Sequence, residues 1–345
     1  MKKIFYLSIM LIVFLSLTAL VPKPVPVMEI DKDTSVWELL KQLGEPEPNH
    51  TIKNLPENAS VEIGRDLVLK GISKPKVGKS SSLQSKHFVC TSCHNIEQED
   101  PDLTVVDPQA RLEYAKQKGI PFLQATTLYG AVNRSSFYND DYEKKYGDLV
   151  IPTRNNLREA IQLCAVECSQ GRILESWELE SVLAYLWTLE YKLDDLNFSS
   201  KEFQSLEAVA KTDADEATKK DLRNLIKGKY LDGIPAHFVE PPANRKKGYD
   251  LKGNPDNGQL IYDLSCKHCH ERQRYSFFNL DDSKTTFKYL KKHFKKHTRY
   301  STYKVVRFGA ESNPGKMAYM PQYTKEKMTD QQVEDLRAYI EMRAK

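Results

Sequence analysis

The sequence predicts an all-helical protein with two compact domains, and three observations support this prediction. Its 345 residues are too many for one small domain and enough for two. Apolar residues recur at helical spacing, and the clearest stripe consists of Leu179, Val182, Leu183, Leu186 and Leu189. We find no convincing strand run and no fixed-period repeat along the chain.

Polar segments precede and separate the two domains. We expect an export segment, a lead-in, a first domain, a charged connection and a second domain, with boundaries at 1–27, 28–60, 61–193, 194–244 and 245–345. The first domain contains a predicted helix over 157–170 that Gly171 closes. A Thr-x-x-Gln capping box at Thr329 and Gln332 begins the final helix at Asp330.

The N-terminal segment has the pattern of an export signal. Lys2 and Lys3 precede an uncharged apolar run over 4–20, and a proline-rich stretch follows. The run exceeds the roughly 15 residues at the upper end of signal-peptide cores and lacks a clean small-x-small cleavage site. A cleaved signal and a retained anchor both remain open. We therefore expect an exported, periplasmic protein, soluble or tethered, with membrane contact only through this segment.

The composition is that of ordinary packed domains, and the net charge gives no indication of a nucleic-acid partner. Hydrophobic residues make up 40% of the chain and charged residues 28%, which is ordinary for packed domains. The net charge of +4, from 51 basic and 47 acidic residues, is too small to indicate a nucleic-acid partner.

The motif C-x-x-C-H, which is typical of covalent haem c attachment, occurs twice. Its residues are Cys90, Cys93, His94, Cys266, Cys269 and His270. Two thiols at this spacing can each bond a vinyl group of the macrocycle, and the adjacent histidine can ligate iron. Zinc would need a fourth ligand, a thioredoxin-like site would need a βαβ surround, and a disulfide at this spacing would be strained. The sequence therefore predicts two covalently attached haem c groups.

The second haem has its axial-ligand candidates near the C-terminus. Met320, followed by Pro321, lies roughly fifty residues after the second motif, with Met317 in reserve. This arrangement resembles class I cytochromes c, in which a Met-Pro loop supplies the thioether ligand. The alternative is that the methionines only pack against the ring and His293 or His297 is the ligand.

The first domain lacks the usual second axial ligands. No methionine occurs over 29–316, and no histidine occurs over 95–236. The remaining candidates are His50, His87, Cys164 and Cys168. The two cysteines share a helix face. Three alternatives remain open for them: two inert buried thiols, a disulfide between them, or one thiolate that ligates the iron. A thiolate would lower the potential of the first haem relative to a His/Met haem, which gives electrons an internal direction.

Four stretches of the first domain resemble one family in order: 90–95, 129–134, 161–172 and 180–186. They are similar to the thiosulfate dehydrogenase family of dihaem cytochromes, and more distantly to the haem subunit of the sulfur-oxidation complex. The resemblance covers most of 60–190. It implies tandem cytochrome c domains and His/Cys ligation of the first haem, with His94 and Cys164 as the ligands. Cys168 has no counterpart in the family pattern.

One departure from the family pattern concerns the substrate. The family has an arginine immediately before the isoleucine at 161 to hold a sulfur oxyanion, and here the residue is Ala160. Nearby arginines that can replace it are Arg134, Arg154, Arg158 and Arg172. For any one of them, a haem propionate contact or a surface position is the stronger alternative. Arg134 and Cys164 are the candidate catalytic residues.

The resemblance implies a dihaem cytochrome that transfers electrons between a His94/Cys164 haem and a His270/Met320 haem. The first haem would oxidise or reduce a small sulfur compound such as thiosulfate, and a redox protein or membrane complex would be the partner. The alternative is a non-catalytic electron carrier, or a haem subunit of a membrane respiratory complex.

Two further patterns concern the haem surroundings. Aromatic residues that we expect to pack against the first haem are Tyr129, Phe137, Tyr138, Tyr142 and Tyr146. A lysine-rich stretch over 288–296 predicts an amphipathic helix with a basic outer face near the second haem. Such a face is usually only solvated, but it could also steer an acidic redox partner or touch anionic lipid.

Overall fold

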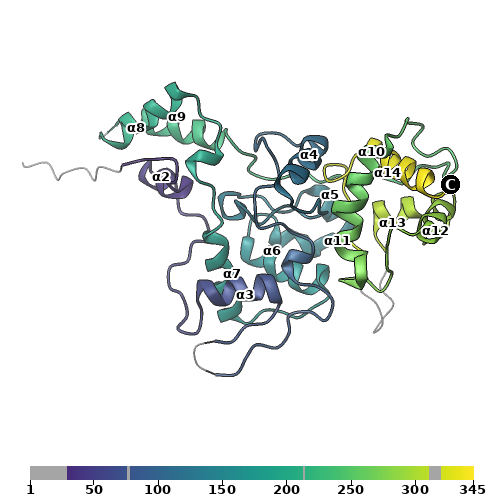
Figure 1. The fold of residues 1–345 in the computed structure, drawn as a ribbon. Helices are drawn as coiled ribbons and strands as arrows, with labels where there is room; N and C mark the ends of the chain where they lie inside the picture. Colours follow the sequence, from purple (N-terminus) through teal and green to yellow (C-terminus); the bar gives the residue numbers. More distant parts are fainter. Residues whose placement is uncertain (1–28, 76–77, 213, 311–319) are drawn as a thin grey trace, which may run out of the picture.

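The computed structural model describes residues 29–75, 78–212, 214–310 and 320–345, and helices dominate these ranges (Figure 1). In chain order the α-helices are α2 (Val36–Gln42), α3 (Val61–Lys70), α4 (Pro108–Lys118), α5 (Asp140–Tyr146), α6 (Leu157–Leu163), α7 (Ser176–Trp187), α8 (Ser200–Ala210), α9 (Glu216–Lys227), α10 (Pro255–Ile261), α11 (Lys267–His270), α12 (Lys284–Phe294), α13 (Thr302–Phe308) and α14 (Asp330–Arg343).

Extended pairing is minimal in the described ranges. It consists of two isolated bridges, Ser35 with Lys192 and Ala310 with Met320. The predicted all-helical class is therefore confirmed. No helix of the described ranges is long and apolar enough to cross a membrane. The predicted export segment over 1–27 lies outside these ranges.

The first group of helices is built on the crossing of α3 and α7. Gly64 makes this crossing close, because a Cβ at that position would lie 1.8 Å from the carbonyl oxygen of Ser181. The predicted apolar stripe forms part of the core, where Leu183 and Leu67 are fully buried. This crossing positions the segments that carry the first C-x-x-C-H motif.

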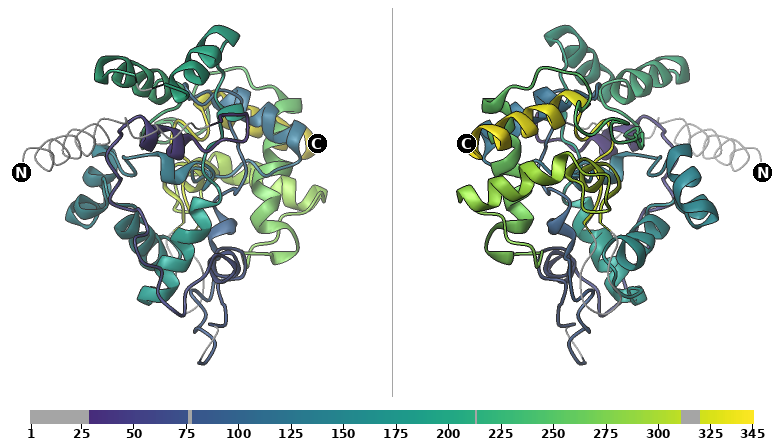
Figure 2. Two further views of the ribbon diagram at one scale, coloured as in Figure 1. Left: turned by 90° about the vertical axis from the view of Figure 1, so that its left-hand side faces the viewer. Right: turned by 90° about the vertical axis from the view of Figure 1, so that its right-hand side faces the viewer.

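The second group repeats that crossing with α10 and α14. A Cβ at Gly258 would lie 1.9 Å from the carbonyl oxygen of Asp335 and 2.9 Å from the Cβ of Tyr339. The Thr329 side chain caps α14, and the Gln332 side chain completes the capping box, as predicted. Helices α12 and α13 pack beside α14 and complete this group (Figures 1 and 2).

A third group combines the lead-in with the charged connection. Helix α2 packs with α8 and α9 around a separate apolar cluster that includes Leu39, Leu206 and Ile226 (Figure 1). The backbone N–H of Val36 donates to the carbonyl of Tyr191 at 3.0 Å, which ties this group to the end of the first. Two segments expected as polar connections thus share one core.

Helix α4 crosses from the first half of the chain into the core of the second group. Leu112, Ala115 and Phe122 are buried there, and the N–H of Phe122 donates to the carbonyl of Leu264 at 2.9 Å. Gln109 and Asn257 exchange side-chain hydrogen bonds across the same contact. The two halves therefore share a core as well as a surface.

Candidate functional site

The first C-x-x-C-H motif folds as a short turn that orients its histidine. Cys90–Ser92 forms one turn of 3-10 helix, and the N–H of His94 donates to the carbonyl of Cys90 at 3.0 Å. His94 Nδ1 donates to the carbonyl of Thr126 at 2.6 Å, which leaves Nε2 free as a lone-pair donor for a metal. Burial lowers the pKa of His94 and so favours this neutral state.

A cavity of about 250 Å³ lies beside this motif, and two cysteine-bearing segments of the chain, each called a wall below, line it. Cys90, Cys93 and His94 form one wall, and Cys164 and Cys168 are on the other. Apolar lining residues include Val68, Phe88, Leu157, Ile161, Leu174, Val182 and Leu186. Two attachment thiols, an imidazole with a free Nε2 and an apolar lining together fit a covalently bound haem.

The two cysteines of the second wall lie on a π-helix. The predicted helix over 157–170 is α6 followed by the π-helical segment Cys164–Cys168, in which the N–H of Ser169 donates to the carbonyl of Cys164 at 2.9 Å. The left-handed residue at its end is Gln170, with φ of 53°, so the predicted stop at Gly171 is one residue too late. π-helical turns often mark functional positions.

The two thiols lie four residues apart on that wall. The neighbouring Cys164 is the largest factor that raises the pKa of Cys168. Cys168 also interacts electrostatically with His94 on the other wall. All six cysteines of the chain are free. The sequence argument favoured Cys164 and gave Cys168 no role, whereas the structure places both at the cavity.

Neither alternative histidine lines this cavity. His50 Nε2 lies 2.8 Å from the carbonyl of Val132 and Nδ1 lies 3.3 Å from Asn49 Oδ1, so both ring nitrogens have protein partners. His87 is half-buried and lies outside the cavity lining.

Of the four arginines considered as anion ligands, three pair with carboxylates. Their pairs are Arg154 with Asp140 and Glu143, Arg158 with Glu180, and Arg172 with Glu178. Arg134 is buried, lines the cavity and donates only to oxygens of Thr127, Tyr129 and Tyr191. Its Nε has no partner among the described residues. Arg134 is therefore the arginine of this set that is suited to an anionic group at the cavity.

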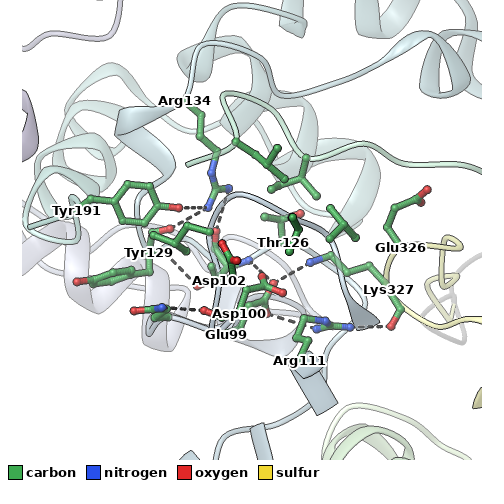
Figure 3. Close-up of a pocket in the computed structure, with 17 residues that line it drawn as sticks. Glu99, Asp100, Asp102, Arg111, Thr126, Tyr129, Arg134, Tyr191, Glu326 and Lys327 are labelled. Atoms are coloured by element: carbon green, nitrogen blue, oxygen red, sulfur yellow. Dashed lines mark hydrogen bonds and ion pairs between the residues drawn. The ribbon is translucent and has the colours of Figure 1, made fainter. Parts of the chain in front are cut away.

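A buried charge cluster joins this region to the second half of the chain (Figure 3). Glu99 Oε1 lies 2.7 Å from Lys327 Nζ, and Glu99 Oε2 lies 3.5 Å from Arg111. Burial raises the pKa of Glu99, but Lys327 and Arg111 outweigh it and lower the pKa to about 2. Burial raises the pKa of neighbouring Asp100. Lys327 also lines the cavity beside the first motif, so a residue near the C-terminus contributes to this site.

The predicted aromatic residues divide between two places. Four of them line the cavity: Phe137, Tyr138, Tyr142 and Tyr146. Tyr129 instead lines the small pocket of Figure 3. Its hydroxyl donates to Asp195 at 2.7 Å. Tyr146 is 38% exposed, so the cavity reaches solvent at this residue.

The second motif lies at the end of another π-helix, Tyr262–Cys266, and continues into α11. His270 Nδ1 donates to the carbonyl of Phe278 at 2.7 Å, which repeats the arrangement at His94. Burial lowers the pKa of His270 as well. Cys269 Sγ lies 3.8 Å from the carbonyl oxygen of Ser92, so the two motifs are adjacent in space.

Of the four residues considered as the second axial ligand of the second haem, three lie among the described residues. The backbone of Met320 pairs with Ala310 at 3.0 and 3.1 Å, and Met317 lies outside the described residues. His293 is buried, with Nδ1 held at 2.8 Å from the Tyr289 carbonyl, and His297 is exposed. Pro321, which follows Met320, lines the first cavity.

Comparison with known proteins identifies the class of the second half. Residues 253–340 match the family described as cytochrome C oxidase, cbb3-type, subunit III. The match includes the second C-x-x-C-H motif and most of the helices α10 to α14, and it assigns a cytochrome c domain to this part of the chain. Such a domain implies covalently bound haem c, so the chain is an electron-transfer haem protein. The matched family is not the thiosulfate dehydrogenase family, whose likeness rests on residues 60–190. No curated protein and no solved structure matches the chain.

Proposed function

We propose that this protein is an exported dihaem c-type cytochrome that transfers electrons between a haem in each half of the chain. In the first half, Cys90 and Cys93 attach the haem and His94 and Cys164 are the axial ligands. The observation that carries this proposal is the cavity itself, because both the attachment motif and the cysteine pair line it. The repeated glycine-mediated helix crossings at Gly64 and Gly258 support two tandem cytochrome c domains.

The second haem is attached through Cys266 and Cys269, with His270 and Met320 as its ligands. The histidine geometry supports this assignment, because both motifs leave Nε2 free in the same way. The contact between Cys269 and Ser92 supports direct transfer between the two haems, since no third cofactor has to bridge them. Each iron supplies a one-electron couple.

The substrate proposed for the first haem is a small sulfur oxyanion such as thiosulfate. Two thiosulfate dianions joined through sulfur give tetrathionate and release two electrons, which is one for each haem. Arg134 supports anion binding because its buried guanidinium has no carboxylate partner among the described residues, whereas Lys327 at the same cavity is already paired with Glu99. Arg134 can instead hold a haem propionate, which would leave a carrier without substrate.

The proposal is tested with low-temperature electron paramagnetic resonance of the oxidised protein. We expect a low-spin thiolate signal in Cys168→Ser, in which Cys164 has no second thiol beside it, and no such signal in Cys164→Met, together with a potential of the first haem that is on the order of 100 mV higher in Cys164→Met. A signal in Cys164→Met that is absent in Cys168→Ser would assign the ligand to Cys168. Unchanged signals of the His/Met or His/His type in both variants would contradict thiolate ligation. Absence of haem reduction by thiosulfate, and of reoxidation by tetrathionate, would leave only electron transfer.

The alternative function is a non-catalytic electron carrier or a haem subunit of a membrane complex. Helix α12 favours a role in electron delivery, because no acidic residue occurs over 284–310 and the exposed Lys288 and Lys292 have no ion-pair partner among the described residues. The Tyr289 ring on this helix lies 5.2 Å from Phe278, whose carbonyl holds His270. A redox partner with an acidic surface could thus bind beside the second haem.

A further inference from the structure

We propose that Cys164 and Cys168 form a redox-active dithiol that the two haems oxidise to a disulfide within the same chain. The inference rests on the proposed function only for the presence of two haems. It gives Cys168 a role that the family resemblance does not supply, and it holds whichever of the two sulfurs ligates the iron.

The geometry brings the two thiols together at the haem cavity. Both line the same wall of the cavity, at the two ends of one five-residue π-helical segment. In a regular helix, residues four apart are separated by about 6 Å along the axis, within the roughly 4.4–6.8 Å that separates the Cα atoms of disulfides. The π-helical turn replaces the regular hydrogen-bonding pattern over Cys164–Cys168, where side-chain directions would otherwise be fixed by the α-helix. The spacing of the two thiols along this segment is therefore one that a disulfide can span.

The electron count matches the two proposed haems. Two thiols lose two protons and two electrons as the S–S bond forms, and each ferric haem takes one electron to become ferrous. The protons leave to solvent where the cavity opens at Tyr146. No other oxidant is needed for this step, and reoxidation of the haems by the redox partner completes the cycle.

Disulfide formation also changes the first haem. A sulfur that is bonded to another sulfur is no longer a thiolate, so the iron loses that ligand when the dithiol is oxidised. The first haem would then have an open position at the cavity only in the disulfide state. The pair would act as a two-electron store and as a switch of iron coordination.

The inference is tested by counting electrons and thiols in the whole haem-loaded protein. Fully reduced protein is titrated without oxygen with ferricyanide, and samples are denatured in iodoacetamide for mass spectrometry. We expect wild type to take four oxidising equivalents and to change from two alkylated cysteines to none. Cys168→Ser should take two equivalents and keep one alkylated cysteine throughout. Glu167→Gln, on an exposed position of the same π-helix, should behave as wild type.

Oxidised wild-type protein with two equivalents consumed and both cysteines alkylated would overturn the inference. This result requires no variant to fold. The outcome is separate from that of the ligation test, because a disulfide can form in a protein that lacks the thiolate signal. Conversely, a thiolate signal with two alkylated cysteines would support the ligation and reject the dithiol.

Discussion

The two C-x-x-C-H sites orient their histidines in the same way but differ in the residues that are candidates for the second axial ligand. Each proximal histidine is oriented by a backbone carbonyl, Thr126 for His94 and Phe278 for His270. The cavity beside the first is also lined by Cys164 and Cys168, whereas the candidate for the second is Met320, whose backbone pairs with Ala310. A local motif therefore determines where a haem can be attached. The residues that would give each haem its role come from segments distant from that motif in sequence.

The largest expected effect separates the two haems by their attachment. Replacing both Cys90 and Cys93 by alanine should remove only the first haem and halve the haem content per chain, because the second motif is independent in sequence. Cys266→Ala with Cys269→Ala should remove the other half. Haem content per chain by the pyridine haemochrome assay checks both, and full haem content in either variant would contradict the assignment.

A second prediction concerns the charge cluster that joins the halves. Glu99→Gln should destabilise the protein by about 3–5 kcal/mol, because Lys327 and Arg111 remain buried without their counter-charge. The lowered pKa of Glu99 means that its contribution is present above its unfolded value and is lost as pH falls toward about 2. Denaturant unfolding at neutral and acidic pH measures both, and the variant should lose less stability than wild type upon acidification.

The exposed pair Asp66 with Lys70 provides the matched control for that prediction. Asp66→Asn should cost less than about 1 kcal/mol, because solvent screens a surface ion pair. Equal effects of Asp66→Asn and Glu99→Gln would show that burial does not set the strength of the cluster.

The two helix crossings can be compared by the same substitution. Gly64→Ala and Gly258→Ala should each destabilise the protein by about 1–3 kcal/mol, because the added Cβ overlaps a backbone carbonyl in both places. Gly119→Ala is a useful contrast, since space is open there but the backbone is left-handed, with φ of 69°. Thermal unfolding followed at the haem absorbance checks the pair, and a tolerated alanine at one crossing would break their equivalence.

The smallest expected effect concerns the lysine face beside the second motif. Lys288→Glu with Lys292→Glu should slow electron transfer to ferricyanide about three- to tenfold at low salt, and less at high salt. Lys86→Glu, an exposed lysine near the first motif, is the control. Stopped-flow rates at several ionic strengths measure the effect, and equal slowing by the control variant would indicate net charge alone.

Local patterns predicted much of this molecule and non-local contacts account for the rest. The capping box at Thr329, the apolar stripe of α7 and the amphipathic α12 each depend on neighbouring residues, and each is present. The shared core of α2, α8 and α9 was not foreseen, because those segments are polar on average and separated by more than 150 residues.

The site was predictable to the same extent. The C-x-x-C-H spacing is a local signal. Because methionine and histidine are lacking over much of the first half, Cys164 and Cys168 remained as ligand candidates there. The contribution of Lys327 to the first cavity had no sequence signal, because it depends on how the C-terminal segment packs against residues more than 200 positions earlier. The π-helical turn was equally invisible, since it differs from an α-helix only in hydrogen-bond register.

The crossing of α4 into the second core determines how the chain can be divided. Leu112, Ala115 and Phe122 cover apolar surface of residues that begin more than 130 positions later. A fragment over 245–345 would expose that surface to water and should aggregate even with its haem attached. During synthesis, α4 emerges before helices α10 to α14, so its apolar face stays uncovered until the last helix has been made. Folding of the second half is therefore the last step in the folding of both halves.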